Sequence, residues 1–339
     1  MVSMKDISKV CGVSVATVSK ALNDHTDIGE ATKQHIRQVA SEMGYYPNSA
    51  AKMLKTNRSR NIGVLFKDHA ASGLTHEYFA MMLDHFKTEV EKQGYDLTFI
   101  NTEGRSEEGR LTYLAHARYR SFDGVLIACV NDFLAPEVLE LVRSDIPVVS
   151  IDHVYEGHTA VMSDNAQGMR DLVNFCYRQG HRRIALIHGE DRDVTSIRLD
   201  TFRETTKQLG LEIPEEYIRT SDYRDTDGAM KRTRELLALP VPPTCILYPD
   251  DFSALGGIDE IKAKGLRIPE DISIVGYDGI RISRHLVPRL TTLRQSTEQI
   301  GEIAAKKLIE AMERPGKVKP EQVVIGGEVY KGESVAQIG

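Results

Sequence analysis

No apolar run in this sequence approaches the roughly 20 residues that a membrane-spanning helix needs. The chain begins MVSMKD, so polar residues appear within the first six positions. This start lacks the apolar stretch of a secretory signal peptide. The cysteines lie far apart, with neither CxxC pairing nor zinc spacing, and are expected to be reduced thiols: Cys11, Cys129, Cys176 and Cys245. These absences predict a cytoplasmic protein that needs neither a metal ion nor a cofactor.

Motifs of common catalytic sites are also missing. The chain has no Walker loop, no GxGxxG after a strand, no HExxH and no GxSxG. His188 stands at the end of a strand-like run, where a histidine is more often structural than catalytic. An enzyme on a doubly wound fold therefore stays only as a remote alternative, since that fold implies no chemistry by itself. A stand-alone transport protein is excluded more firmly, because it would need a signal peptide.

What is present is an ordinary globular composition with an uneven distribution of charge. The 339 residues are 41% hydrophobic and 27% charged, which suits two or three compact units. Residues 1–60 carry nine Lys or Arg against five Asp or Glu, a net charge of +4. Because the whole chain has a net charge of -6, the remaining residues carry a net charge of -10. A basic head on an acidic body is typical of DNA-binding proteins, because phosphates attract only nearby charge. Chance clustering of charged residues could produce the same net charge of +4, so the local sequence pattern must decide whether the head binds DNA.

The first 25 residues predict two short helices joined by a turn. Ser3 followed by Asp6 is a capping-box-like start, and Gly12 supplies a turn residue that tolerates a positive φ. Ser14 can cap a second helix, whose apolar stripe includes Val18. This order is that of a helix-turn-helix, whose second helix lies in the major groove of DNA. A third helix is expected at about residues 31–43.

The run from residue 4 to residue 23, MKDISKVCGVSVATVSKALN, resembles the head of the lactose-repressor (LacI/GalR) family. Its GVSxxTVSxxxN pattern is the specific part. Pro47 then breaks the chain, and Asn48 can cap a short helix at about residues 48–55. By the resemblance this is a hinge helix that folds on operator binding and inserts Leu54 into the minor groove. Unstacking costs a few kcal/mol, offset by the larger protein surface that bent DNA touches.

The resemblance also implies how the head contacts DNA. Val15 and Ala16 offer apolar contact, for instance to a thymine methyl, and Lys20 could donate to guanine acceptors or only touch phosphate. Serine and threonine hydroxyls on the same helix are expected to hold phosphates. The expected DNA-binding residues are Ser14, Val15, Ala16, Thr17, Ser19, Lys20, Asn23 and Leu54.

From residue 62 onward, short apolar strands alternate with amphipathic helices. The strand-like runs are residues 62–66, 97–100, 124–127, 148–151, 184–187, 245–248 and 272–275. Such alternation implies an α/β fold with parallel sheets covered by helices on both faces. Two sets of strands predict two lobes, with a ligand crevice at the carboxyl ends of the strands.

This body resembles the family's periplasmic-binding-protein-like core, most specifically from Gly265 to Asp278. The implied division is a head at 1–60 and an effector-binding and dimerisation core at 61–339. Its first lobe comprises about residues 61–161 and 291–322, and its second comprises 162–290 and 323–339. The chain would thus cross between lobes near 161, 291 and 322, which leaves a hinge for closure.

Effector-binding positions follow from the same resemblance. Arg198 matches an arginine that clamps sugar hydroxyls or a carboxylate, Asp278 an acceptor of sugar hydroxyls, and Tyr223 an aromatic that stacks on a ring. Carboxylates, arginine and aromatic faces together suit a polyhydroxylated ligand. The full set is Asp68, Tyr78, Phe79, Asp152, Arg198, Tyr223, Asp250 and Asp278.

Structural alternatives remain open for several of these residues. Arg198 could pair only with a surface carboxylate, and Asp152 and Asp250 could simply be caps. Tyr78 and Phe79 could equally be core residues. The loop at 69–77 is longer than in many family members, which could make it a lid or an extra contact to ligand or partner.

The sequence therefore predicts a transcriptional regulator, usually a repressor in this family, that binds double-stranded DNA under the control of a small effector such as a sugar. No leucine-heptad tail is present, so a homodimer on a pseudo-palindromic operator is expected. Effector binding would close the lobes and bias the hinge helices, as an inducer or as a corepressor. The alternative is a carbon-catabolite-type regulator controlled by a phosphoprotein partner.

Overall fold

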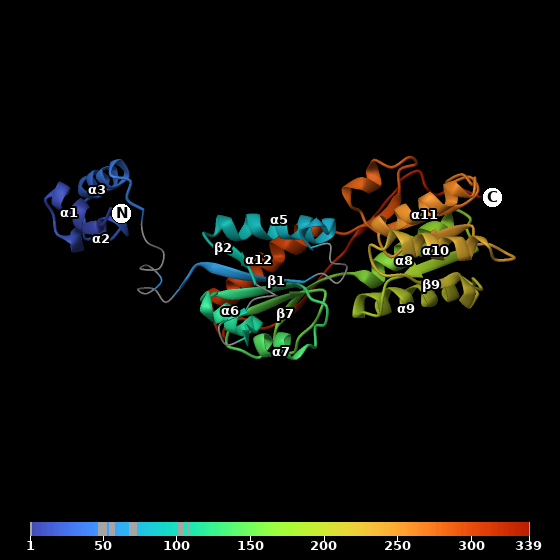
Figure 1. The fold of residues 1–339 in the computed structure, drawn as a ribbon, viewed down its shortest axis with the longest axis horizontal. Coiled ribbons are helices and arrows are strands. Elements are labelled where there is room, and N and C mark those ends of the chain that lie inside the picture. The colour runs from blue at the N-terminus through green and yellow to red at the C-terminus, as the bar shows by residue number, and fades with distance from the viewer. Residues whose placement is uncertain are drawn as a thin grey trace. The chain divides into compact units, whose positions relative to one another are not determined.

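The computed structural model describes residues 2–46, 53, 58–67, 73–100, 105–106 and 109–338. It divides into two units, Met1–Ser59 and Arg60–Gly339, which are drawn in Figure 1. The predicted hinge helix at about 48–55, with Leu54, lies outside the described residues except for Met53. No helix in the described part of the chain is long and apolar enough to span a bilayer.

The first unit is the predicted helix-turn-helix with a third helix. Its helices are α1 (Met4–Cys11), α2 (Val15–Leu22) and α3 (Glu30–Glu42). The N–H and hydroxyl of Ser3 both donate to Asp6 Oδ2, at 3.0 and 2.7 Å, which confirms the capping-box start. Gly12 ends α1 with a φ of 64°, and Ser14 Oγ accepts the N–H of Thr17 at 3.0 Å to begin α2. The helices enclose a small core of Ile7, Val18, Ala21, Ile36, Val39 and Ala40.

The first lobe of the second unit is built on a parallel sheet in the order β13-β7-β6-β5-β1-β2. Its strands are β1 (Asn61–Phe66), β2 (Asp96–Phe99), β5 (Gly124–Cys129), β6 (Val148–Ile151), β7 (Thr159–Ser163) and β13 (Gln322–Ile325). Alternate strand residues face opposite sides, so Ile62 and Val64 pack on one face and Leu65 on the other. The first face carries α5 (Glu77–Lys92) and α12 (Thr297–Glu313). The second carries α6 (Tyr113–Tyr119) and α7 (Pro136–Val142).

Two short elements accompany this lobe. A 3₁₀ turn, η1 (Gly73–Thr75), precedes α5 and forms the described end of the long 69–77 loop. An antiparallel ribbon joins β3 (Arg105–Ser106) to β4 (Gly109–Arg110). The η1 turn leads the chain directly toward the cavity described below.

The second lobe repeats the plan with a sheet in the order β14-β12-β11-β10-β8-β9. Its strands are β8 (Ile184–His188), β9 (Ile218–Thr220), β10 (Cys245–Leu247), β11 (Ser273–Asp278), β12 (Thr291–Arg294) and β14 (Glu328–Tyr330). Among the described strands of this sheet, only β14 pairs antiparallel, with β12. One face packs on α8 (Asn165–Arg178) and α9 (Asp193–Gln208), and the other on α10 (Thr226–Leu237) and α11 (Asp251–Ala263). Short 3₁₀ turns are η2 (Glu215–Tyr217) and η3 (Arg281–Arg284).

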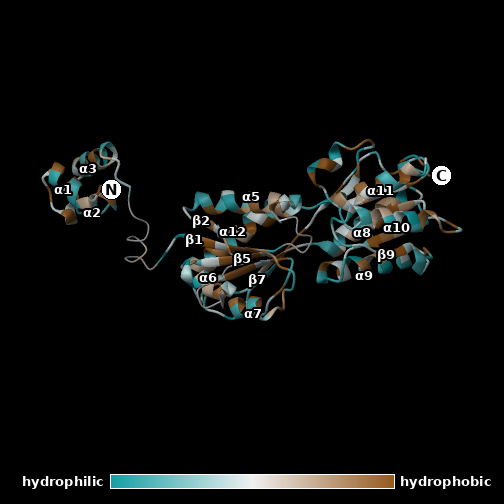
Figure 2. Ribbon diagram, viewed as in Figure 1, coloured by the Kyte–Doolittle hydropathy of each residue, from teal (hydrophilic) through white to brown (hydrophobic). Residues whose placement is uncertain are grey.

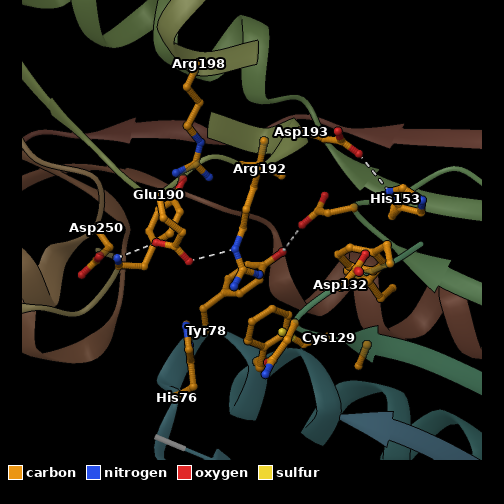
Figure 3. Close-up of a pocket in the computed structure, with 18 of the residues that line it drawn as sticks. His76, Tyr78, Cys129, Asp132, His153, Glu190, Arg192, Asp193, Arg198 and Asp250 are labelled. Atoms are coloured by element: carbon orange, nitrogen blue, oxygen red, sulfur yellow. Dashed lines mark hydrogen bonds and ion pairs between the residues drawn. The ribbon is translucent and has the colours of Figure 1, made fainter. Parts of the chain in front are cut away.

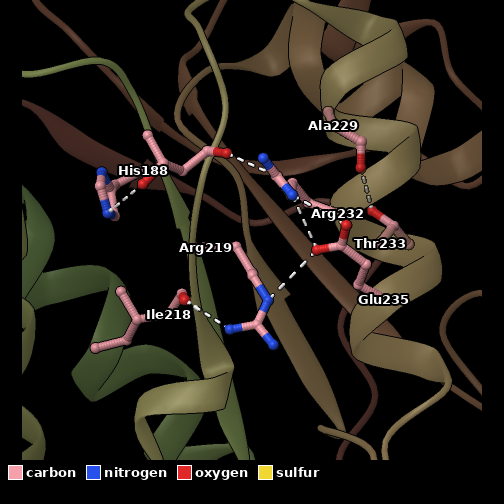
Figure 4. A network of polar contacts seen from close by, with 8 residues as sticks. His188, Ile218, Arg219, Ala229, Arg232, Thr233 and Glu235 are labelled. Atoms are coloured by element: carbon pink, nitrogen blue, oxygen red, sulfur yellow. Dashed lines mark hydrogen bonds and ion pairs between the residues drawn. The ribbon is translucent and has the colours of Figure 1, made fainter.

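Figure 2 shows apolar residues along the strands of both lobes and hydrophilic residues on the outer faces of the helices. Polar side chains contact the edge strand β9 of the second sheet (Figure 4). Arg232 donates through Nη1 to both carboxylate oxygens of Glu235. Its Nε donates to Thr220 O of β9 at 2.8 Å. His188 bonds Gly189 O at 2.9 Å and Thr220 Oγ1 at 3.2 Å. Both ring nitrogens of His188 are thus engaged in local contacts, as the structural interpretation requires.

The strand pairings place the crossovers between lobes a few residues later than predicted. The chain leaves the first sheet after β7, returns after β12 and leaves again after β13. Residues 291–294, expected to open the second part of lobe one, instead pair with β11 in lobe two. Residues 323–325, expected in lobe two, pair with β7 in lobe one. Each strand continues to the crossover itself, and strand ends are the features that sequence patterns locate least well.

The segment from α12 onward serves both lobes. α12 and Ile325 of β13 belong to the core of the first lobe. β14 forms an edge of the second sheet, and buried Ser334 donates to Ile274 O at 2.7 Å and accepts the N–H of Thr291 at 2.8 Å. Both cores therefore depend on residues from the last part of the sequence.

Candidate functional site

A cavity of about 450 Å³ opens where the carboxyl ends of the two sheets face each other. Its walls come from residues at or shortly after the carboxyl ends of β5, β6, β8, β9, β10, β11 and β12, together with the N-terminal parts of α5 and α9. This is the crevice that parallel α/β sheets create outside their strand ends. Figure 3 shows the side chains that converge on it.

The cavity brings together predicted effector residues that are far apart in the sequence. Asp68, which follows the first strand, lies outside the described residues. The others line this single cavity: Tyr78, Phe79, Asp152, Arg198, Tyr223, Asp250 and Asp278.

Arg198 reaches the cavity from α9 and is 7% exposed. Its Nε donates to Asn165 Oδ1 at 2.8 Å and its Nη1 to Pro249 O at 3.2 Å, while the guanidinium carbon lies 3.5 Å from the centre of the Tyr277 ring. Burial alone would lower the pKa of Arg198, but Tyr277 and the cavity carboxylates raise it, so the group stays charged. The alternative of a simple surface ion pair is wrong, because the side chain is buried.

Asp278 faces the cavity from the end of β11. Its φ of 99° is unusual for a residue other than glycine, and such strain concentrates at functional sites. Asp278 Oδ1 accepts Nε2 of Gln295 at 2.7 Å, and Oε1 of Gln295 is buried without a partner among the described residues. Burial raises the pKa of Asp278 to about 6, with Arg198 opposing the shift.

Asp152 and Tyr78 form the opposite wall, on the first lobe. Asp152 has a φ of 53°, and its Oδ1 accepts the N–H of Ser163 at 2.7 Å. The Tyr78 hydroxyl donates to Asp152 Oδ2 at 3.2 Å, and burial raises the pKa of both groups. Phe79 packs edge-on against Phe66 at 5.4 Å and also borders the core of this lobe. Phe79 therefore serves the core and the cavity together.

Asp250 is used differently from Asp278. It caps α11: Oδ1 accepts the N–H of Ser253 at 2.7 Å, and Oδ2 accepts the Ser253 hydroxyl and the N–H of Arg224, both at 2.8 Å. Both oxygens already have partners, which favours the cap alternative. The Tyr223 hydroxyl shares a hydrogen bond of 3.0 Å with Thr195 Oγ1. The Tyr223 ring packs directly on Gly189, where a Cβ atom would lie only 2.2 Å from the ring.

Sequence reasoning missed several cavity residues on the loops after the strands. Arg192 lies in the middle of the cavity (Figure 3), where its Nε donates to Glu190 Oε1 at 2.8 Å. Glu190 Oε2 also accepts the N–H of Tyr223 at 3.0 Å. No motif marks these residues, but their place just after β8 is a signal that could have found them.

Contacts across the cleft join the two lobes. His153, stacked on Phe133 at 4.4 Å, bonds Asp193 Oδ2 through Nδ1 at 2.9 Å. On the opposite side, the N–H of Arg281 donates to Glu77 Oε1 at 2.7 Å. The two lobes are therefore in direct polar contact, and the His153–Asp193 bond lies in the wall of the cavity.

The predicted DNA-contacting residues of α2 are largely accessible. Ser14, Val15, Ala16, Lys20 and Asn23 are exposed, whereas Thr17 and Ser19 are half-buried. Asn23 Nδ2 donates to Ser19 O at 2.7 Å. The ammonium of Lys20 is bonded to Asp27 Oδ2, which sequence reasoning did not anticipate.

Within the described part of the chain, no three His, Cys, Asp or Glu side chains are grouped to hold a metal ion. The four cysteines are free thiols, and the sulfurs of buried Cys176 and Cys245 lie 3.7 Å apart. The cavity thus offers hydrogen-bonding groups, a buried cation and aromatic faces, which are the means of binding a small molecule.

A helix-turn-helix head followed by a two-lobed body with a ligand cavity defines a DNA-binding transcriptional regulator rather than an enzyme. Residues 3–48 match the bacterial regulatory proteins of the lacI family, and residues 173–335 match the periplasmic binding protein-like domain. The chain belongs to the lacI family of bacterial regulatory proteins. The predicted fold and family are thereby confirmed.

Known proteins resemble the chain over its whole length. It is 30% identical over 341 residues to the "Probable HTH-type transcriptional repressor ExuR" of Bacillus subtilis, covering 100% of this chain and 99% of that protein. The solved complex of the transcriptional regulator CelR with cellobiose is 25% identical, with a TM-score of 0.71, and the match covers 98% of this chain and 100% of that one. The lac repressor dimer, solved with operator and the anti-inducer ONPF, has the same fold, with 22% identity, a TM-score of 0.84 and 99% of both chains covered.

Proposed function

We propose that this regulator is a repressor that binds a pseudo-palindromic operator as a homodimer and is controlled by a sugar or sugar derivative in the cavity. One observation carries the effector proposal: Arg198 and Asp278 of one lobe line the same cavity as Asp152 and Tyr78 of the other lobe. A ligand held between them contacts both lobes at once. Its binding energy therefore favours one lobe arrangement over another, which is how a ligand shifts a conformational equilibrium.

The chemistry of the cavity supports a polyhydroxylated ligand. Sugar hydroxyls donate and accept, so they can satisfy arginine N–H groups and carboxylate oxygens together. Gln295 Oε1 is a buried acceptor to which a ligand hydroxyl could donate, and buried polar atoms without partners are uncommon. Phe133 and Tyr223 add apolar faces for a sugar ring. The repressor named ExuR, the cellobiose complex of CelR and the operator-bound lac repressor dimer support the same proposal.

The effector proposal predicts a selective thermal shift. Purified protein is melted with monosaccharides, disaccharides, sugar phosphates and nucleobases. A ligand present at about 100 times its Kd stabilises the folded state by about 2.7 kcal/mol and raises Tm by several degrees. We expect at least one sugar or sugar derivative to do so. A shift with nucleobases alone would overturn the choice of sugars.

The operator proposal predicts that Leu54→Ala weakens specific binding by about tenfold, or roughly 1.4 kcal/mol, and leaves non-specific binding almost unchanged. Alanine cannot wedge into a base step as leucine does. Operators are first selected from randomised duplexes, with half-sites about one helical turn apart. Val10→Ala is the control, because Val10 is an exposed apolar side chain on α1, 62% accessible. Equal losses on operator and random DNA would contradict a wedge at Leu54.

A further inference from the structure

Acidic residues in the connection between α2 and α3 and at the start of α3 pair with three of the basic residues of the head. Asp24 accepts from Lys33 and Arg37, each at 2.9 Å, and Glu30 lies 3.3 Å from the ammonium of Lys33. Asp27 binds the ammonium of Lys20. Lys33 and Arg37 belong to α3, so among these three cations Lys20 is the one that belongs to α2.

Lys20 occupies a distinctive place on α2. Ala16, Lys20 and Asn23 are spaced four and three residues apart, so they share one face of the helix, and all three are exposed. The Lys20 and Asp27 side chains are 47% and 54% exposed, so their contact lies at the protein surface. The hydrogen bond from Lys20 lowers the pKa of Asp27, which keeps the carboxylate charged.

An ammonium has three N–H groups, and Asp27 occupies one of them. The flexible four-carbon stem would otherwise let the charge sample many positions. Holding one N–H restricts where the other two point and leaves both able to donate. The Asp27 carboxylate also competes with DNA phosphates, which are anions of the same kind, for the Lys20 charge.

We propose that Asp27 is a specificity-determining residue of the DNA-binding head. It holds the Lys20 ammonium over the exposed face of α2, so that the free N–H groups of Lys20 meet a guanine edge. It also keeps Lys20 from binding the phosphates of non-target DNA. This inference rests on the proposed operator binding by α2. Lysine reads guanine through O6 and N7, whereas a phosphate contact carries no sequence information. Asp27 thereby converts a general cation into a base-reading one.

The variant Asp27→Asn separates these two roles of Lys20. Without the carboxylate, Lys20 is free to neutralise a phosphate, so we expect stronger binding to random DNA. The slope of log K against log salt should steepen by about 0.9 for one added phosphate contact. Preference for the base pair that Lys20 reads should fall at least about threefold, since the ammonium loses its fixed direction.

Asp24→Asn is the matched control. It removes the same charge from the same connection between α2 and α3, but the partners of Asp24 are Lys33 and Arg37. General electrostatic attraction should therefore rise in both variants, whereas base preference should change only in Asp27→Asn. Asp27→Glu keeps a carboxylate and should restore most of the preference, which a merely structural role in the loop would not explain.

The experiment uses the full chain and selection from a randomised duplex library followed by sequencing. Wild type, Lys20→Ala, Asp27→Asn, Asp27→Glu and Asp24→Asn are compared, and binding to one random duplex is measured at several salt concentrations. We expect Lys20→Ala to lose one base preference in each half-site and Asp27→Asn to weaken that same preference. Identical sequence profiles for Asp27→Asn and Asp24→Asn would overturn the inference, as would an unchanged profile for Lys20→Ala. Failure of the wild type to enrich any palindrome would instead refute the operator proposal itself.

Discussion

Arg198→Ala is expected to abolish the response to effector while operator binding persists. Hydrogen bonds from a charged group contribute about 1.5–3 kcal/mol, and Asn165 Oδ1 and Pro249 O would lose a donor in the same step. The affinity for effector should therefore fall by roughly 10- to 150-fold for each hydrogen bond that Arg198 donates to the effector. The head retains its own core, so operator binding by the variant should be the same with and without effector, at concentrations that change wild-type binding. Calorimetric titration and operator binding with and without effector measure both effects.

Arg203→Ala is the control for this change. Arg203 lies on the same helix, but its exposed side chain pairs with Glu215 at 2.8 Å outside the cavity. An exposed ion pair contributes about 0–1 kcal/mol, so the response to effector should be unaffected. Some loss of stability is expected in Arg198→Ala, about 1–3 kcal/mol, from the acceptors left unpaired. If Arg198→Ala is folded and still binds effector with wild-type affinity, the cavity is not the effector site.

Asp278→Asn is expected to stabilise the ligand-free protein and to remove most of its affinity for effector. The folded-state pKa of Asp278 is about 6, against 3.8 for the ordinary group, so the folded protein holds this proton more tightly. Stability from this group is present below about pH 4 and is lost as pH rises through about 6. A full shift of this size would cost about 3 kcal/mol at neutral pH. The cavity is open to water, so we expect Asp278→Asn to recover about 1–2 kcal/mol.

Denaturant unfolding at pH 7.5 and pH 4 measures this effect. The gain in the free energy of unfolding should be present at pH 7.5 and nearly absent at pH 4, where wild-type Asp278 is protonated. The asparagine amide oxygen can still accept Nε2 of Gln295, so the local contact is retained. Asp132→Asn serves as the control, because Asp132 is an exposed carboxylate at the same cavity. A gain that does not vary with pH would contradict the assignment to the Asp278 proton.

The sequence predicted the parts of this protein that depend on local pattern. Strand runs buried on both faces are apolar throughout, so their number and order indicated two parallel sheets. The cap at Ser14 and the turn at Gly12 follow from backbone chemistry within a few residues. Asp278 was assigned to the effector site by the family resemblance, and its place at the carboxyl end of a parallel strand agrees with that assignment.

Other features depend on which loops come together, and no local pattern encodes them. His153 and Asp193 are 40 positions apart and meet only because the lobes close on each other. Asp250 followed a strand just as Asp278 did, yet the N–H of Arg224, from 26 residues earlier, occupies its Oδ2. Composition could not distinguish a cap from a ligand contact there, because aspartate suits both. The pairing of Lys20 with Asp27 likewise depends on the path of an irregular connection.

The division of the last part of the chain between both lobes has a consequence for protein synthesis. Among the residues that the structure describes, the core of the head draws on positions within the first 46, so it can form soon after they emerge. Neither lobe can complete its core until α12, β13 and the segment around Ser334 have been made. A premature stop after β12 would thus release a head without its sensor, a fragment whose DNA contacts no effector could regulate.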